Sequence, residues 1–195
     1  MKRTLITAAI LLAASVGAFA QTAASTVQRD VNQQQRIERG LQNGNLTTRE
    51  AAQLERDESH VDKLQAQALK DGKPTDAERA RLKAAQNKSS RDINAAEHNG
   101  VNGNPQSVSS KRMQADVQRN ISQEKRVEGG IQNGSLTNHE VAKLERGQAK
   151  VDHKEAVAGR DGKVNAVEQA RVQRTENRQS KKIRHEKTDA DNRKG

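Results

Sequence analysis

Apolar side chains recur along this chain every three to four residues, and the pattern appears twice. Each set falls within roughly 120° of a helical wheel turned by about 100° per residue, which is typical of one narrow buried helix face. No segment alternates between apolar and polar residues with the period of two that marks a strand. The sequence therefore predicts an all-α protein. The two stripes comprise Val27, Val31, Ile37 and Leu41, then Val117, Ile121, Val127 and Ile131.

The chain is an internal duplication. A shift of 90 residues aligns positions 27–99 with 117–189, and 30 of the 73 aligned residues are identical. The segment between them, 100–116, is rich in Asn, Gly and Ser and contains one Pro, which is typical of a flexible linker. We therefore expect two tandem copies of a three-helix unit, at 27–99 and 117–189, joined by the linker 100–116 and followed by a polar tail at 190–195.

The helix boundaries are marked by four similar corners. In each, a Gly suited to a left-handed C-terminal cap is followed by Thr or Asn and, three residues later, by Glu, which is the pattern of an N-terminal capping box. The corners begin at Gly44, Gly72, Gly134 and Gly162. Each copy is thus divided into three helices at equivalent places.

The N-terminal residues have the pattern of an export signal. Lys2 and Arg3 precede an apolar run from Leu5 to Val16, and small residues end the segment at Ala18 and Ala20. Such a segment predicts a signal peptide at 1–20, cleavage after Ala20, and a mature N-terminus at 21–26. We expect a periplasmic or secreted protein without a membrane span in its mature chain, because the apolar run is too short to cross a bilayer.

Composition limits what the remaining chain can do. Leu, Ile and Val number 26 in residues 21–195, and Phe19 is the only aromatic residue. Such a chain builds a small core, so we expect helices that form a loosely packed bundle or that tighten on a partner. There is no cysteine, which excludes disulfides and thiol chemistry. No pattern of catalytic residues is present, so we expect no enzyme, and the lack of aromatics argues against sequence-specific nucleic-acid recognition.

The four corners also resemble the second half of an EF-hand calcium loop, in which Gly at position 6 precedes an oxygen donor at 9 and a bidentate Glu at 12. The first half keeps one side-chain donor of the usual three, so helix capping remains the simpler interpretation. The alternative hypothesis is a weak calcium-responsive module; otherwise we expect no cofactor. Its ligands would be Asn43, Thr47, Glu50, Asp71, Thr75, Glu78, Asn133, Thr137, Glu140, Asp161, Asn165 and Glu168.

Positive charge is concentrated at the C-terminus. The whole chain carries a formal net charge of +10, and the last predicted helix has basic residues at three-to-four spacing. Such a stripe can hold phosphates or anionic headgroups. Our first functional hypothesis is therefore an exported, non-enzymatic binding or scaffold protein that contacts an anionic surface or polymer through this helix. The residues are Arg171, Arg174, Arg178, Lys181, Lys182 and Arg184.

The string IERGLQNGNLTTREAAQLE at 37–55 and the string DGKPTDAE at 71–78 resemble a family of uncharacterised exported helical-repeat proteins of Gram-negative bacteria. Members of that family carry similar Gly-x-Leu-Thr-x-x-Glu corners. The resemblance covers both copies, and it implies an exported helical protein without implying an activity.

Overall fold

The computed structural model describes residues 10–191, and all of its regular elements are helices. The predicted all-α class is therefore confirmed. The basic start of the predicted signal, Lys2 and Arg3, lies outside the described residues, as does the tail from 192 onward. The helices are α1 (Ile10–Asn43), α2 (Thr48–Leu69), α3 (Asp76–Glu97), α4 (Val108–Asn133), α5 (Asn138–Ala158) and α6 (Ala166–Thr188).

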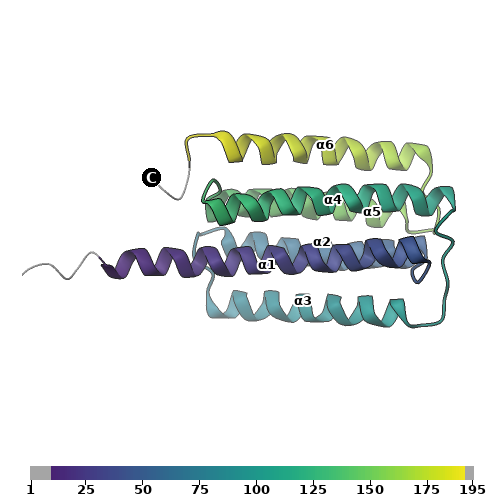
Figure 1. The fold of residues 1–195 in the computed structure, drawn as a ribbon, viewed down its shortest axis with the longest axis horizontal. Coiled ribbons are helices and arrows are strands. Elements are labelled where there is room, and N and C mark those ends of the chain that lie inside the picture. Colours follow the sequence, from purple (N-terminus) through teal and green to yellow (C-terminus); the bar gives the residue numbers. More distant parts are fainter. Residues whose placement is uncertain (1–9, 192–195) are drawn as a thin grey trace, which may run out of the picture.

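The six helices lie alongside one another, and successive helices run in opposite directions (Figure 1). The most extensive contacts join helices of different copies, α2 with α5 and α1 with α4. The outer helix α3 packs on α1 and α2, while α6 packs on α4 and α5. The four helices α1, α2, α4 and α5 therefore form the centre of the bundle, and α3 and α6 cover its two edges.

Helix starts are fixed by the residues that the sequence marks. Thr47, Thr75, Thr137 and Asn165 each accept a hydrogen bond from the backbone N–H of the Glu three residues later, whose side chain in turn accepts from the cap backbone. This exchange satisfies N–H groups that the first helical turn leaves free. Before these caps the chain turns at Gly44, Gly72, Gly134 and Gly162, which have φ near +80°.

The core is apolar at two places and polar between them. One apolar cluster includes Leu46 and Leu54 and lies near the end of the bundle where α1 turns into α2. The other includes Leu69 and Leu136 and lies where α2 ends and α5 begins. The middle turns of α2 and α5 bury Glu, Asp and Gln side chains instead.

The linker and the first helix differ from the sequence prediction in extent. Residues 108–116, predicted as part of the flexible linker, are helical and belong to α4, because Ser107 caps this helix and Met113 is buried against the core. Equivalent positions in the first copy also lie in α1, which runs through Ala20. Among the described residues, no helix is both long and apolar enough to cross a membrane.

Candidate metal centre

Acidic side chains line the facing surfaces of α2 and α5. Glu55 and Asp62 project from α2, and the equivalent residues of the second copy, Glu145 and Asp152, project from α5. All four are at most 3% exposed. Residues seven apart lie on the same face of a helix, so each helix directs two carboxylates at the other.

Three of the buried carboxylates form a compact group that we name site 1. Glu55 of α2 meets Asp152 and Glu155 of α5, with carboxylate oxygens within 4.8 Å of one another. The amide nitrogen of Gln34 on α1 donates a hydrogen bond to Oε2 of Glu55 at 2.9 Å. Site 1 therefore combines three carboxylates and one amide from three helices.

A second group, site 2, has the same make-up. Asp62 of α2, Glu124 of α4 and Glu145 of α5 have carboxylate oxygens within 4.8 Å of one another. Gln65 lies one helical turn after Asp62, is 0% exposed, and has no hydrogen-bond partner for either amide atom among the described residues. The residues of site 2 thus occupy positions equivalent to those of site 1. Where site 1 uses a residue of one copy, site 2 uses the equivalent residue of the other copy.

Few donors reach these carboxylates. No lysine, arginine or histidine is buried within the part of the chain that the structure describes. Neither oxygen of Glu145 or of Glu155 has a partner in the hydrogen-bond network there, and one oxygen each of Glu55, Asp62 and Glu124 is also left over. Buried carboxylates are rarely left in this state, because removing an unpaired charge from water is costly.

Burial makes the ionised form of each carboxyl group costly. It raises the pKa of Glu55 to about 7, although the hydrogen bond from Gln34 acts in the opposite direction. Burial likewise raises the pKa of Glu124 to about 7. The pKa values of Asp62, Glu145, Asp152 and Glu155 are raised well above their ordinary values by burial and by repulsion between neighbouring carboxylates. At neutral pH the centre must therefore gain protons or another positive charge.

A neighbouring carboxyl pair exists only in the first copy. Asp30 of α1 and Glu58 of α2 repel each other, and each has a neutral partner on α3: the amide of Gln86 donates to Asp30 at 2.6 Å, and the Ser89 hydroxyl donates to Glu58. The second copy has Asn120 and Gln148 at the equivalent positions, and they hydrogen-bond to each other at 2.5 Å. The first copy therefore adds two more buried carboxyl groups beside the two sites.

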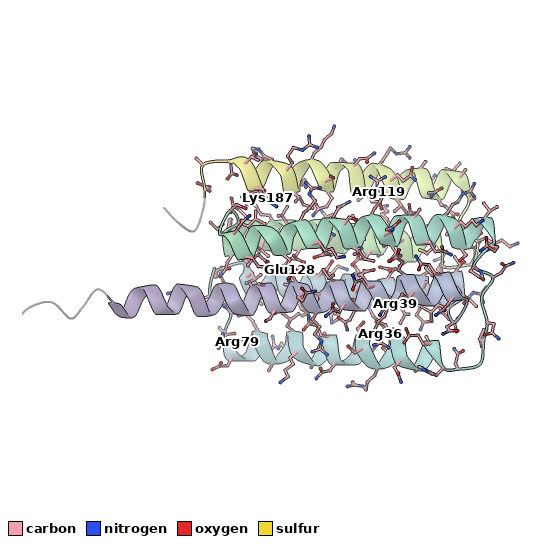
Figure 2. All side chains as sticks on the ribbon, viewed as in Figure 1. Arg36, Arg39, Arg79, Arg119, Glu128 and Lys187 are labelled. Atoms are coloured by element: carbon pink, nitrogen blue, oxygen red, sulfur yellow. The ribbon has the colours of Figure 1, made fainter. Side chains whose placement is uncertain are left out.

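The outer edge of the centre does reach a basic residue. Glu176 of α6 is 0% exposed, and its Oε2 lies 3.2 Å from Nε of Arg119 on α4. Figure 2 shows Arg119 at the junction of α4 and α6, and Arg36 on α1 on the side of α3. Arg36 pairs there with Glu97 at 2.5 Å. Arg119 and Arg36 therefore form their ion pairs at the edges of the bundle, away from sites 1 and 2.

The structure gives the twelve corner residues of the calcium hypothesis another arrangement. Glu50, Glu78, Glu140 and Glu168 are engaged in capping boxes. The side chains of Asn43, Asn133 and Asp161 accept backbone N–H groups two residues ahead, while Asp71 is an exposed turn residue. Only Glu140 among the corner carboxylates belongs to a close group of three, with Glu186 and Asp189. Each corner thus forms a helix cap in which Thr, or Asn at the fourth corner, exchanges hydrogen bonds with Glu.

The predicted basic stripe lies on the outer surface of α6. Arg171, Arg174, Arg178, Lys181, Lys182 and Arg184 are all exposed. Within residues 10–191 none of them forms an ion pair. The stripe is therefore accessible to solvent along the length of the helix.

Comparison with protein-family models, with curated proteins and with solved structures found no match to the chain.

The carboxylates of sites 1 and 2 are absent from the sequence prediction, which singles out acidic residues only at the four corners. The duplication holds a signal for them. Glu55 and Asp62 are identical in the second copy, at Glu145 and Asp152, whereas the half-buried Asp57 and the exposed His60 change. Acidic residues that keep their identity at seven-residue spacing indicate a buried face.

Proposed function

We propose that this protein binds hard, oxygen-preferring metal cations at sites 1 and 2, inside its helical bundle. The observation that carries the proposal is the pair of fully buried three-carboxylate groups, which no basic residue buried in the described part of the chain neutralises. An amide oxygen adds to this: Oε1 of Gln34 has no partner, although its amide nitrogen is bonded to Glu55. A bound cation supplies the positive charge and the coordination bonds that these oxygens lack.

The donor set selects the class of metal. Sites 1 and 2 offer carboxylate and amide oxygens without histidine, and the chain has no cysteine. Such ligands suit calcium, manganese and other hard cations, whereas zinc and copper favour imidazole and thiolate. Magnesium keeps several waters and is rarely held by an all-protein cage. Calcium-sized cations are therefore a better match than magnesium to these closed sites.

The first test is thermal unfolding of the purified chain, followed by far-ultraviolet circular dichroism. Melting is compared in chelator and in excess calcium, manganese or lanthanum chloride. Because bound cations stabilise the folded state by mass action, we expect at least one of these cations to raise the Tm by more than about 10 °C at pH 7.5. Identical melts in chelator and in all three salts would refute the proposal.

A paired substitution separates metal binding from folding. Glu55→Gln with Glu145→Gln removes one carboxylate from each site, and we expect the cation-dependent rise in Tm to be lost. The same pair should leave the chelated protein as stable as before or more stable, because a neutral amide is cheaper to bury. Glu38→Gln with Glu128→Gln is the matched control: these equivalent residues bond Gln42 and Gln132 outside the core. This control should keep the cation response.

The proposal also accounts for the architecture. We propose that the chain is an exported tandem duplication whose two three-helix copies join through α1–α4 and α2–α5 packing. The small apolar content then leaves the middle of the bundle weak until a cation is bound. A cation thus takes the place of the partner on which the sequence predicts the helices to tighten.

A second candidate function is contact with an anionic surface through α6. It is favoured by the exposure of the six basic residues of the stripe and by their lack of ion pairs. We expect sedimentation with phosphatidylglycerol vesicles that weakens steeply as salt is raised. Arg178→Gln with Lys182→Gln should reduce it more than Lys83→Gln with Arg91→Gln on α3. Equal loss in both variants, or binding insensitive to salt, would eliminate this candidate.

A further inference from the structure

Sites 1 and 2 contain the same number of carboxylates, and a comparison of equivalent positions in the two copies explains why. At the positions equivalent to Gln34, Glu55, Asp152 and Glu155 of site 1, site 2 has Glu124, Glu145, Asp62 and Gln65. Two of the four positions therefore differ between the copies. Gln34 is replaced by Glu124, and Glu155 is replaced by Gln65.

These two differences compensate each other. A change at either position alone would leave one site with two or four carboxylates, whereas the pair leaves three carboxylates and one amide in each. The folded arrangement explains why the count is kept per site, because each site draws residues from both copies. The count of three is thus a property of each site and not of each copy.

A buried site stabilises the cation whose charge it neutralises. In a low-dielectric interior, an unbalanced charge costs several kcal/mol, since water cannot solvate it. Three carboxylates balance a charge of three. A divalent ion would leave a net negative charge in each site, next to the further carboxyl groups of Asp30 and Glu58. We infer that sites 1 and 2 each take one trivalent, oxygen-preferring cation, in preference to a divalent cation of similar size.

Side chains outside the acidic groups point to the same ligand. Gln34 is 2% exposed and its amide lies against Glu55, yet its carbonyl oxygen Oε1 has no partner. At site 2, Gln65 is 0% exposed, and its carbonyl oxygen is equally without a partner among the described residues. Buried carbonyl oxygens that lack a donor, on side chains next to a carboxylate group, are available as metal ligands.

The number of donor atoms suits a large cation. The three carboxylates of a site supply six oxygens when all are bidentate, and one amide carbonyl supplies a seventh. This matches the roughly six to eight oxygen ligands that calcium-sized ions take. Because every ligand side chain is at most 3% exposed, few or no water molecules remain on the bound ion.

The experiment titrates the chelator-treated protein with lanthanum or calcium chloride, and native mass spectrometry counts the bound ions. We expect two lanthanum ions per chain, and a calcium affinity at least about a hundredfold weaker in competition. Europium, excited directly because the mature chain has no aromatic residue, should show a luminescence lifetime almost equal in H₂O and D₂O. Calcium affinity equal to or above that of lanthanum would overturn the inference.

The compensating positions supply a rescue test. Glu155→Gln leaves site 1 with two carboxylates and should lower its lanthanum affinity at least about a hundredfold. Adding Gln34→Glu gives site 1 the composition of site 2 and should restore the second lanthanum ion. Failure of the double variant to recover binding, while its chelated form melts like the parent chain, would contradict the counting of charge per site.

This inference rests on the proposed function, but the two can fail separately. Two calcium or manganese ions bound more tightly than lanthanum would keep the proposed cation function and remove the preference for trivalent ions. One lanthanum ion per chain would remove the two-site arrangement. Absence of binding by all three cations would remove both.

Discussion

Glu50 and Glu55 lie on the same helix, α2, and show how differently one residue type is used at the corners and in the middle of the bundle. Burial alone would raise the pKa of Glu50, but hydrogen bonds from Thr47 and Asn99 outweigh it and hold the pKa below its ordinary value. Burial dominates at Glu55 and raises its pKa to about 7. The corner thus stabilises a carboxylate with donors from the protein, whereas the middle leaves it dependent on a charge from outside.

The largest expected effect is an opposite pH response of the two regions. Glu55 and Glu124 have folded pKa values of about 7, and Glu176 of about 8, all above the unfolded value. Their contribution is fully present below the unfolded pKa of about 4.5 and is lost as pH rises from there to the folded pKa, by about 1.4 kcal/mol per group and pH unit. The chelated protein should therefore melt more than about 10 °C lower at pH 8 than at pH 5.

Thermal melts between pH 5 and 8, with and without lanthanum, test whether the corners and the middle of the bundle respond to pH in opposite directions. Saturating cation should flatten the fall, because the bound ion replaces the protons. The corner glutamates act in the other direction: Glu50 and Glu78 have lowered pKa values, so their contribution is present above pH 4.5 and is lost in stronger acid. If the chelated protein gains stability between pH 5 and 8, the buried carboxyl groups in the middle of the bundle do not have the raised pKa values described above.

The next largest effect concerns Glu58, which is buried beside Asp30 and corresponds to Gln148 in the second copy. Burial and the repulsion of Asp30 raise its pKa well above the ordinary value. Glu58→Gln should stabilise the chelated protein by about 1–3 kcal/mol at pH 7.5, because it removes the cost of burying a charge. Urea unfolding measures this gain; a loss of stability would show that the carboxylate is favourable where it lies.

Corner substitutions should have smaller effects, of the opposite sign. Thr47→Ala and Thr137→Ala each remove the side chain that caps a helix start. Each should cost about 1 kcal/mol in urea unfolding, equally in chelator and in cation. A cation-dependent difference between Thr47→Ala and the parent chain would instead return the corners to consideration as metal sites.

The smallest effect is expected at Asn99, whose amide donates to Oε1 of Glu50 at 2.6 Å. The equivalent residue of the second copy is Asp189, which faces Glu140. Asn99→Asp places two carboxylates together at an exposed position, so we expect a loss of roughly 0.5 kcal/mol or less at pH 7.5. The loss should shrink at pH 4, and urea unfolding at the two pH values checks it.

Local features of the fold could be predicted from the sequence because they depend on neighbouring residues. The helical class follows from apolar spacing, and the capping boxes of Thr47 and Thr137 follow from a Glu three residues later. The middle of the bundle could not be predicted in this way. Glu55 is buried because α5 of the other copy lies over it, and nothing within its own helix distinguishes it from a solvent-facing glutamate. The pairing of α2 with α5 was needed to bring the carboxylates together.

Composition is also an incomplete guide to what is inside. The sequence predicts a small core from its few Leu, Ile and Val residues, and this count omits the buried Gln65, Gln148 and Glu155. These side chains fill much of the volume between α2 and α5 without adding the stability that burial of hydrocarbon gives. The space between α2 and α5 therefore holds polar atoms that could bind a cation, where apolar contacts would otherwise be made.

The interleaving of the two copies bears on how such a protein could arise and diverge. In a homodimer of single copies, every substitution would appear in both sites at once, so both sites would have to remain alike. Fusion into one chain removes that constraint, and Gln34 can differ from Glu124 while Gln65 differs from Glu155. Covalent linkage also makes the pairing of the halves independent of protein concentration. The duplicated chain can thus let sites 1 and 2 diverge independently while the two halves stay joined.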